Sequence, residues 1–233
     1  MKRLSLHDPP FNAGLGRGVT VAVVDSGIHA EHPHIGSRVI GGVCVLPAGD
    51  STDWVDRIGH GTAVAAAIHE KAPLAELLSV RVFDRSLSTS AQSLADAIVW
   101  SADHGANLIN LSLGTANTEH RDSLTDAIAY AIDRKALVVS ARELNGQAFL
   151  PGSLEGAAGV ILDWECERDQ IGLIESGGSN QVYAASGFPR PIPGVPTERN
   201  LSGISFAVAN VTGFLARMMS GEASPTASLE ASR

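Results

Sequence analysis

The sequence has little of what disulfide-stabilised and nucleic-acid-binding proteins require. Only two cysteines, Cys44 and Cys166, occur among 233 residues. We therefore expect no disulfide framework, although the alternative of a single disulfide between these two cysteines stays open. We also expect a reducing compartment such as the cytoplasm. The 17 basic residues are outnumbered by 25 acidic ones, which gives a net charge of -8. Because nucleic-acid binding needs clustered positive charge, no nucleic-acid partner is predicted.

Hydrophobic runs and metal-binding patterns are also scarce. The N-terminus, MKRLSLHDPPFNAG, has two early positive charges but no apolar run behind them. This predicts neither a secretory signal nor a membrane anchor, so no membrane partner is expected. The segment HAEHPH carries His29, His32 and His34, whose spacing matches no usual zinc pattern, and no acidic cluster indicates calcium. No metal or other cofactor is predicted.

The chain has enough apolar residues, 44% by composition, to bury one sizeable core. We expect one domain over residues 1–220. The remaining residues, 221–233, are poor in apolar side chains and are expected to be disordered.

Strand-like and helix-like segments alternate along the chain. Strands are predicted at 19–25, 75–83, 107–113 and 136–141, and helices at about 60–70, 88–105, 123–135 and 205–219. Within the helix 88–105, Leu94, Ala97, Ile98 and Ser101 share one face, and Ser88 or Ser90 can cap its start. Such alternation predicts an α/β fold, with a mostly parallel sheet and helices on both faces. After residue 146 the pattern loosens into short strands and loops, and the proline-rich FPRPIPGVP is expected to be a surface loop.

Three polar residues stand at the ends of these elements. Asp25 ends a strand, while His60 and Ser205 each open a helix. A serine hydroxyl needs a base to become a nucleophile, and an imidazole held by a carboxylate is such a base. Each residue also has a plain structural interpretation: a turn residue for Asp25, a first-turn helix residue for His60 and an N-cap for Ser205. The three together, in the order Asp, His, Ser, favour a catalytic triad.

The local contexts resemble those of one family. VAVVDSGIHAEHP, GHGTAVAAAI and GISFAVA resemble the aspartate, histidine and serine motifs of the subtilisin-like serine peptidases (subtilases, peptidase family S8), and NLINLSLG resembles their substrate-binding strand. The resemblance implies a subtilisin-like three-layer sandwich and a triad of Asp25, His60 and Ser205. It also implies substrate binding along Ser112, Leu113 and Gly114. The chain resembles a minimal, intracellular-type member without a propeptide.

The resemblance fails at the second oxyanion donor. The family supplies an asparagine from an Ala-Ala-Gly-Asn-like turn, whereas this chain reads LVVSARELNGQAFLPGS. Asn145 is the candidate there, one residue beyond the expected place, and the alternative is that the donor is absent. Milder departures from the family's usual residues are Ala63, Ile204, Ala209 and Asn210.

Together these features predict a serine endopeptidase that hydrolyses peptide or protein substrates, and one specialised form would be a processing or maturation peptidase for a specific peptide. The alternative is a subtilase-like peptide-binding module with weak or no turnover, or one active only with a partner chain whose identity the sequence does not give.

Overall fold

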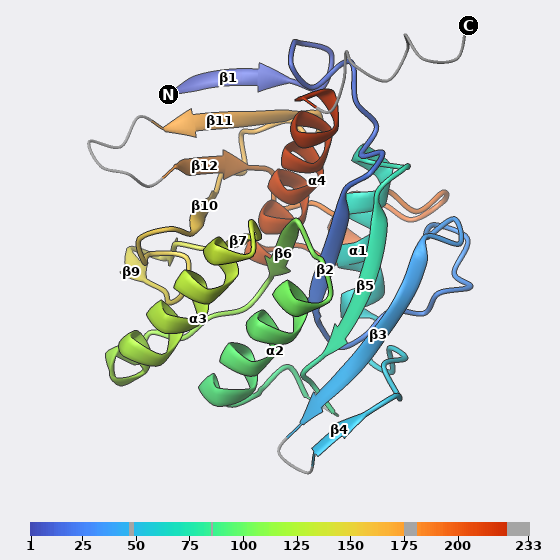
Figure 1. Cartoon of the computed structure of the whole chain (residues 1–233). Coiled ribbons are helices and arrows are strands. Elements are labelled where there is room, and N and C mark those ends of the chain that lie inside the picture. The colour runs from blue at the N-terminus through green and yellow to red at the C-terminus, as the bar shows by residue number, and fades with distance from the viewer. Residues whose placement is uncertain (47–48, 85, 175–180, 223–233) are drawn as a thin grey trace, which may run out of the picture.

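The computed structural model describes residues 1–46, 49–84, 86–174 and 181–222. Most of its strands join one ten-stranded sheet, in the order β1-β11-β12-β10-β7-β6-β2-β5-β3-β4 (Figure 1). The strands are β1 (Lys2–Ser5), β2 (Thr20–Asp25), β3 (Val39–Leu46), β4 (Gly49–Ser51), β5 (Glu76–Arg81), β6 (Leu108–Leu111), β7 (Leu137–Ala141), β10 (Ala158–Leu162), β11 (Gln170–Ile174) and β12 (Val182–Ala185). A separate hairpin pairs β8 (Glu143–Leu144) with β9 (Gln147–Ala148).

The strands from β12 to β3 run parallel, and antiparallel pairing is confined to the edges, where β1, β11 and β4 lie. Helices α1 (His60–Lys71) and α4 (Ile204–Glu222) cover one face of the sheet, and α2 (Ala91–Asp103) and α3 (Arg121–Asp133) cover the other (Figure 1). Two short 3-10 helices, η1 (Thr118–His120) and η2 (Thr197–Arg199), lie in loops. The predicted α/β sandwich with a mostly parallel sheet is confirmed.

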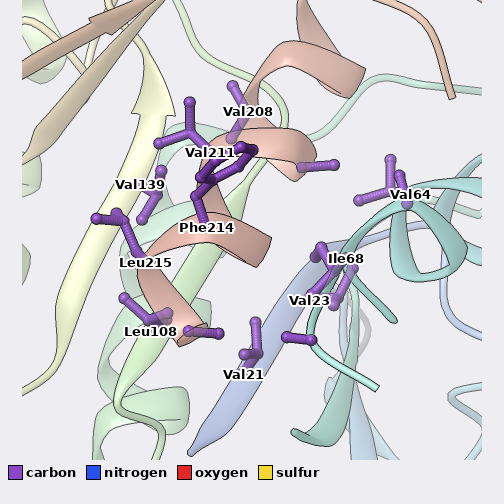
Figure 2. Close-up of a cluster of buried hydrophobic side chains, with 14 of the residues drawn as sticks. Val21, Val23, Val64, Ile68, Leu108, Val139, Val208, Val211, Phe214 and Leu215 are labelled. Atoms are coloured by element: carbon purple, nitrogen blue, oxygen red, sulfur yellow. The ribbon is translucent and has the colours of Figure 1, made fainter. Parts of the chain in front are cut away.

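The core beneath α1 and α4 fixes the place of the functional residues. Figure 2 shows side chains of α4 packed between those of the sheet and of α1. Each large aliphatic side chain that leaves water here stabilises the fold by roughly 1.5–3 kcal/mol. The labelled members of this cluster are Val21, Val23, Val64, Ile68, Leu108, Val139, Val208, Val211, Phe214 and Leu215.

The second core, beneath α2 and α3, follows the predicted helix periodicity. Leu94, Ala97, Ile98 and Ser101 are all buried on one face of α2. Ser90 is the N-cap residue of this helix, and its side chain accepts a hydrogen bond from the Ser93 amide at 3.0 Å. These local predictions were therefore correct.

The structure also differs from the sequence expectations. The Gly-rich stretch after Asp25 contains β3, whose two glycines interrupt the β-branched pattern. A Cβ on Gly42 would collide with the Trp54 ring, so the strand needs glycine to pack there. At the other end of the chain, α4 runs to Glu222, which includes the first two residues of the expected tail. Residues 223–233 lie outside the described residues.

Within the described ranges, no helix combines the length and the apolar composition that crossing a membrane would require.

Candidate active site

Asp25 lies at the carboxyl end of β2, one of the central strands of the sheet. It is the last residue of β2, which pairs in parallel with β5 on one side and β6 on the other. Its side chain is fully buried, and Oδ1 accepts a hydrogen bond from the Ser26 amide at 2.7 Å. In open α/β sheets the carboxyl ends of the strands are where ligands and reacting groups gather.

His60 contacts Asp25 directly. It is the first residue of α1, and its Nδ1 lies 2.7 Å from Asp25 Oδ1. The helix end can approach the strand this closely because the next residue is Gly61. A Cβ at Gly61 would collide with the Gly27 carbonyl oxygen and lie 3.1 Å from the Asp25 Cβ. With Nδ1 held by the carboxylate, the other ring nitrogen of His60 faces away from Asp25, as a base would require.

A second carboxylate, Asp56, organises the start of α1. The N-cap residue of the helix, Gly59, has a φ of 93° and no side chain to cap with. Asp56 replaces such a cap, because Oδ1 accepts from the Ile58 and Gly59 amides and Oδ2 accepts from the Thr62 amide, all at 2.8–2.9 Å. The Thr62 hydroxyl also donates to Oδ2 at 2.6 Å.

Asp56 is tied to Asp25 through one further residue. The Ser26 hydroxyl donates to Asp56 Oδ1 at 2.8 Å and accepts from the Gly61 amide at 2.9 Å. Burial opposes ionisation of Asp56, but the Thr62 hydrogen bond and the three amide bonds outweigh it and lower the pKa of this carboxyl. Sequence reasoning missed Asp56, although its position four residues before His60 was a usable signal for a residue that holds the helix end.

The pKa of His60 is raised above its ordinary value of 6.5. Burial disfavours the imidazolium, yet the hydrogen bond to Asp25 and the charges of Asp25 and Asp56 more than offset that cost. The site therefore stabilises the charged ring that forms when His60 accepts a proton.

Ser205 lies in the first turn of α4, one residue before Phe206, whose ring lies near the His60 ring. The helix begins at Ile204, and the ring of Phe206 lies 5.7 Å from the His60 ring, centroid to centroid. The Ser205 hydroxyl donates to the Ser112 carbonyl oxygen at 3.1 Å. Of the side chains that the structure describes, His60 forms no hydrogen bond with this hydroxyl, so the hydroxyl must turn away from Ser112 before His60 can take its proton.

A buried polar network joins β6 to α4 behind Ser205. Asn110 donates to the Ser112 hydroxyl at 2.9 Å and accepts from the Thr212 hydroxyl at 3.0 Å. Asn110 and Thr212 are both fully buried. The network holds the two elements in register, and sequence reasoning missed it. The signal was an asparagine inside the otherwise apolar strand NLINL.

Leu113 and Gly114 follow the end of β6 and are half-buried. One side of this segment already contacts other parts of the chain. The Leu113 carbonyl oxygen accepts a hydrogen bond from the Ser140 hydroxyl at 3.4 Å, and Thr115 pairs with Leu150. A Cβ on Gly114 would collide with the Leu150 carbonyl oxygen. The structure thus brings Ser112 to Ser205 and places Leu113 and Gly114 beyond it, while their role in substrate binding stays a prediction.

Asn145 lies in the two-residue turn of the β8–β9 hairpin. Asn145 and Gly146 have φ values of 53° and 78°, and asparagine followed by glycine is the preferred sequence for such a turn. Asn145 borders a small hollow of about 190 Å³ with Leu144 and Trp164, and no hydrogen bond links it to Asp25, His60 or Ser205 in the described part of the chain. The turn alone explains an asparagine here, which favours the alternative that the second donor is absent, and both alternatives stay predictions.

The three histidines of HAEHPH stay on the surface loop after β2. His32 and His34 contact edge to face, with ring centroids 5.1 Å apart. Across the described ranges, no three His, Cys, Asp or Glu side chains are grouped so that they could hold a metal ion.

Comparison with known proteins gives a consistent family. The model of the Subtilase family (Peptidase S8) matches residues 16–147. Thermitase from Thermoactinomyces vulgaris is 31% identical over 86% of this chain and 76% of its own length, and subtilisin Savinase from Lederbergia lenta is 33% identical over 87% and 77%. A thermophilic serine proteinase from Bacillus sp. (strain AK1) is 36% identical over 61% of this chain, which spans only 38% of that protein.

Solved structures show the same fold at lower identity. A lanthipeptide protease superimposes with a TM-score of 0.70 over 91% of this chain and 76% of its own, at 21% identity. Sphericase gives 0.69 over 90% and 79%, also at 21% identity. With the matched family model and relatives above 30% identity over most of the chain, the protein belongs to the subtilase family of serine peptidases.

Proposed function

We propose that this protein is a serine endopeptidase in which Asp25, His60 and Ser205 form the catalytic triad. The observation that carries the proposal is the 2.7 Å contact between His60 and the buried Asp25, with Ser205 in the helix turn that packs against the His60 ring. A relative that is named a thermophilic serine proteinase supports the same reaction.

In the proposed reaction, the Ser205 hydroxyl turns from the Ser112 carbonyl oxygen and attacks the carbonyl carbon of a peptide bond. His60 accepts the hydroxyl proton, and Asp25 stabilises the imidazolium and keeps the ring in position. The positive end of the α4 dipole, at the helix turn that carries Ser205, stabilises the developing oxyanion.

The tetrahedral intermediate then collapses. The C–N bond breaks, His60 returns the proton to the leaving amine, and an acyl ester remains on Ser205. A water molecule, deprotonated by His60, attacks this ester. The C–O bond to Ser205 then breaks, the acyl part leaves as a carboxylic acid, and His60 returns the proton to the Ser205 oxygen. Every proton step therefore passes through the one nitrogen of His60 that does not face Asp25.

A fluorophosphonate probe tests the proposal, because it forms a covalent bond only with an activated serine. We expect peptide-level mass spectrometry to find the label on Ser205 of the folded protein. Ser205→Ala abolishes labelling, whereas Ser202→Ala, a matched change at an exposed neighbour, preserves it. Absence of label from the folded wild-type chain would contradict the proposal.

A peptide-binding module with little turnover is the second candidate. The observation favouring it is the Ser205 hydroxyl, which is bonded to Ser112 and not to His60, together with the turn role of Asn145. Saturable peptide binding without cleavage or labelling would select this candidate, as would turnover that begins only when a partner chain is added.

We also propose the finer role of a processing peptidase for a specific peptide, with the cytoplasm as its location. Cys44 and Cys166 are buried thiols that no disulfide joins, which fits a reducing compartment. A processing enzyme would cleave one precursor sequence and leave unstructured general substrates intact.

A further inference from the structure

A cavity of about 770 Å³ opens beside the N-terminus of α1. Three segments line it: the loop 29–34, the helix start with the residues just before it, and the loop 189–201. Gly59 and Thr62, on either side of His60, belong to its wall, and so does Leu201, four residues before Ser205. Asp25, His60 and Ser205 do not themselves line the cavity, but it lies beside His60, because Gly59 directly precedes His60 in the chain.

The charge of this cavity is opposite to that of the whole chain. Asp56 is the one carboxylate among its lining residues, and its oxygens are occupied by the hydrogen bonds that hold the start of α1. Glu31 and Glu198 belong to the same loops but do not line the cavity. The basic side chains of the lining are His29, His32, His34, Arg57, Arg190 and Arg199, in a chain whose net charge is -8.

Two of these basic groups are available to a ligand. Arg57 is paired with Asp53 at 2.7 Å, whereas Arg190 and Arg199 have no carboxylate within ion-pair distance in the described part of the chain. Arg190 is held in place by a hydrogen bond from its guanidinium to the His34 carbonyl oxygen at 3.1 Å. A positioned guanidinium without a carboxylate is suited to bind one.

The His34 side chain on the cavity wall lies in the same positive potential. Burial, the nearby Arg190 guanidinium and His32 lower the pKa of His34, although Glu70 acts in the opposite direction. His32 accepts a hydrogen bond from the His34 amide at its Nδ1, which leaves its Nε2 as the N–H donor. Neutral His32 can therefore add a hydrogen bond to an anion.

The proposed proton transfer by His60 indicates which part of a substrate would enter the cavity. His60 must protonate the leaving amine, so the peptide after the scissile bond starts at His60. The cavity is lined by Gly59, the residue before His60, and by Thr62, two residues after it. The acyl part, in contrast, stays attached to Ser205, whose hydroxyl contacts the end of β6.

We propose that this cavity binds an acidic side chain of the substrate segment that follows the scissile bond. Arg190 and Arg199 would pair with the carboxylate, while Ile58, Pro189 and Leu201 would contact its apolar stem. This inference rests on the proposed peptidase function and adds a substrate class to it.

The test begins with cleavage of a peptide library, read by mass spectrometry, which supplies a cleaved sequence. Two internally quenched peptides of that sequence are then compared, with Glu or Gln in one of the first positions after the scissile bond. We expect the Glu peptide to have a kcat/KM about tenfold higher, the effect of one charge-assisted hydrogen bond. The ratio should fall toward one in about 0.5 M sodium chloride, because salt screens the ion pair.

Variants localise the effect. Arg190→Gln and Arg199→Gln should each reduce the Glu-to-Gln ratio to about threefold or less, whereas Arg121→Gln, which removes the same charge from the exposed start of α3, should leave it unchanged. A wild-type ratio near one, or an equal loss in Arg121→Gln, would overturn the inference while leaving the peptidase function intact. Absence of both cleavage and Ser205 labelling would overturn the proposed function and this inference with it.

Discussion

At the residue scale, two carboxylates act on the charge and the position of the His60 imidazole in different ways. Asp25 contacts the ring, whereas Asp56 acts through its charge and through the backbone of the first turn of α1. Because Asp56 does not touch His60, it is a positioning residue, and its two effects can be measured separately.

Asp56→Asn should lower the pKa of His60, since one of the charges that raises it is removed. The acid limb of the kcat/KM profile, which reports the free base, should therefore move to lower pH. The variant should also lose about 2 kcal/mol of stability, because an amide NH2 replaces an oxygen that accepts hydrogen bonds. An unchanged acid limb in a folded variant would contradict the charge effect. Asp96→Asn, at an exposed position on α2, is the matched control.

The same carboxyl makes stability depend on pH. Since the folded-state pKa of Asp56 is lowered, its contribution is present above the unfolded-state value near 3.8 and is lost as the pH falls through the folded-state pKa. Acid unfolding of the wild type should therefore show an Asp56-dependent component, visible as a smaller loss of stability below pH 4 in Asp56→Asn.

Asn145→Gly tests the second oxyanion donor. Glycine accepts the positive φ of the turn, so we expect a stability change within about 1 kcal/mol and a loss in kcat of less than roughly tenfold. Loss of an oxyanion donor would instead lower kcat roughly a hundred- to a thousandfold. A fall of that size would assign Asn145 to the reaction and would mean that the hairpin moves when substrate binds.

At the element scale, β6 and α4 depend on each other through Asn110. Thr212→Val keeps the shape of the side chain but removes the hydroxyl, whose one hydrogen is shared between the Asn110 side-chain oxygen at 3.0 Å and the Val208 carbonyl oxygen at 2.8 Å. The buried Asn110 oxygen is then left without a donor. We expect a loss of about 1–2 kcal/mol in the free energy of unfolding, measured with urea. Thr118→Val, at an exposed position in η1, should change it by less than about 0.5 kcal/mol. Equal losses in both variants would argue against the network.

The central elements could be predicted from the sequence because their buried residues recur at the spacing of a strand or a helix. The apolar run 19–25 gave β2, and the spacing of Leu94, Ala97 and Ile98 gave α2. Strand β3 was missed because two glycines interrupt its pattern, and one of them, Gly42, is required by the close approach of the Ser79 carbonyl oxygen and the Trp54 ring. Tertiary contacts decide such strands, and propensity does not.

The same distinction applies to the site. Asp25, His60 and Ser205 stand in recognisable motifs at element ends, and the structure brings Asp25 and His60 into contact. Thr212 was missed because no local feature distinguishes it from a surface residue, whereas the signals for Asp56, four residues before His60, and for Asn110, inside an apolar strand, were present and were not used. The turn at Asn145 was missed for a different reason, since the family resemblance drew attention to a donor and not to the Asn-Gly hairpin signal.

At the scale of the whole molecule, one buried lysine opposes folding. Lys71, at the end of α1, is 2% exposed, and its burial, together with the Arg168 charge, lowers its pKa to about 8 despite the opposing charges of Glu70 and Asp169. Below pH 8 the Lys71 ammonium group is charged in both the folded and the unfolded chain. Burying this charge then lowers the stability of the folded state. Between about 8 and 10.5 the unfolded chain binds more protons, so this cost diminishes as the pH rises.

Lys71→Met should therefore raise the free energy of unfolding at pH 7 by on the order of 3 kcal/mol at most, and the gain over wild type should shrink toward pH 10. Chemical denaturation at several pH values measures both. Lys2→Met, at the exposed edge strand β1, is the control and should show no such pH dependence. A gain that does not vary with pH would point to packing as its cause.

The loop 189–201 before α4 is anchored in a way that lets its sequence change without disturbing the rest of the site. The Asn210 side chain donates to the carbonyl oxygens of Ser186 and Phe188, and the Gly203 amide donates to the Gly187 carbonyl oxygen. The loop is thus clamped at both ends, while the residues between can change in length or sequence at small entropic cost. If residues 189–201 bind substrate as we propose, exchanging them for a loop of another composition would change the substrate preference while the proposed reacting groups stay in place, so a new specificity could be introduced in this segment.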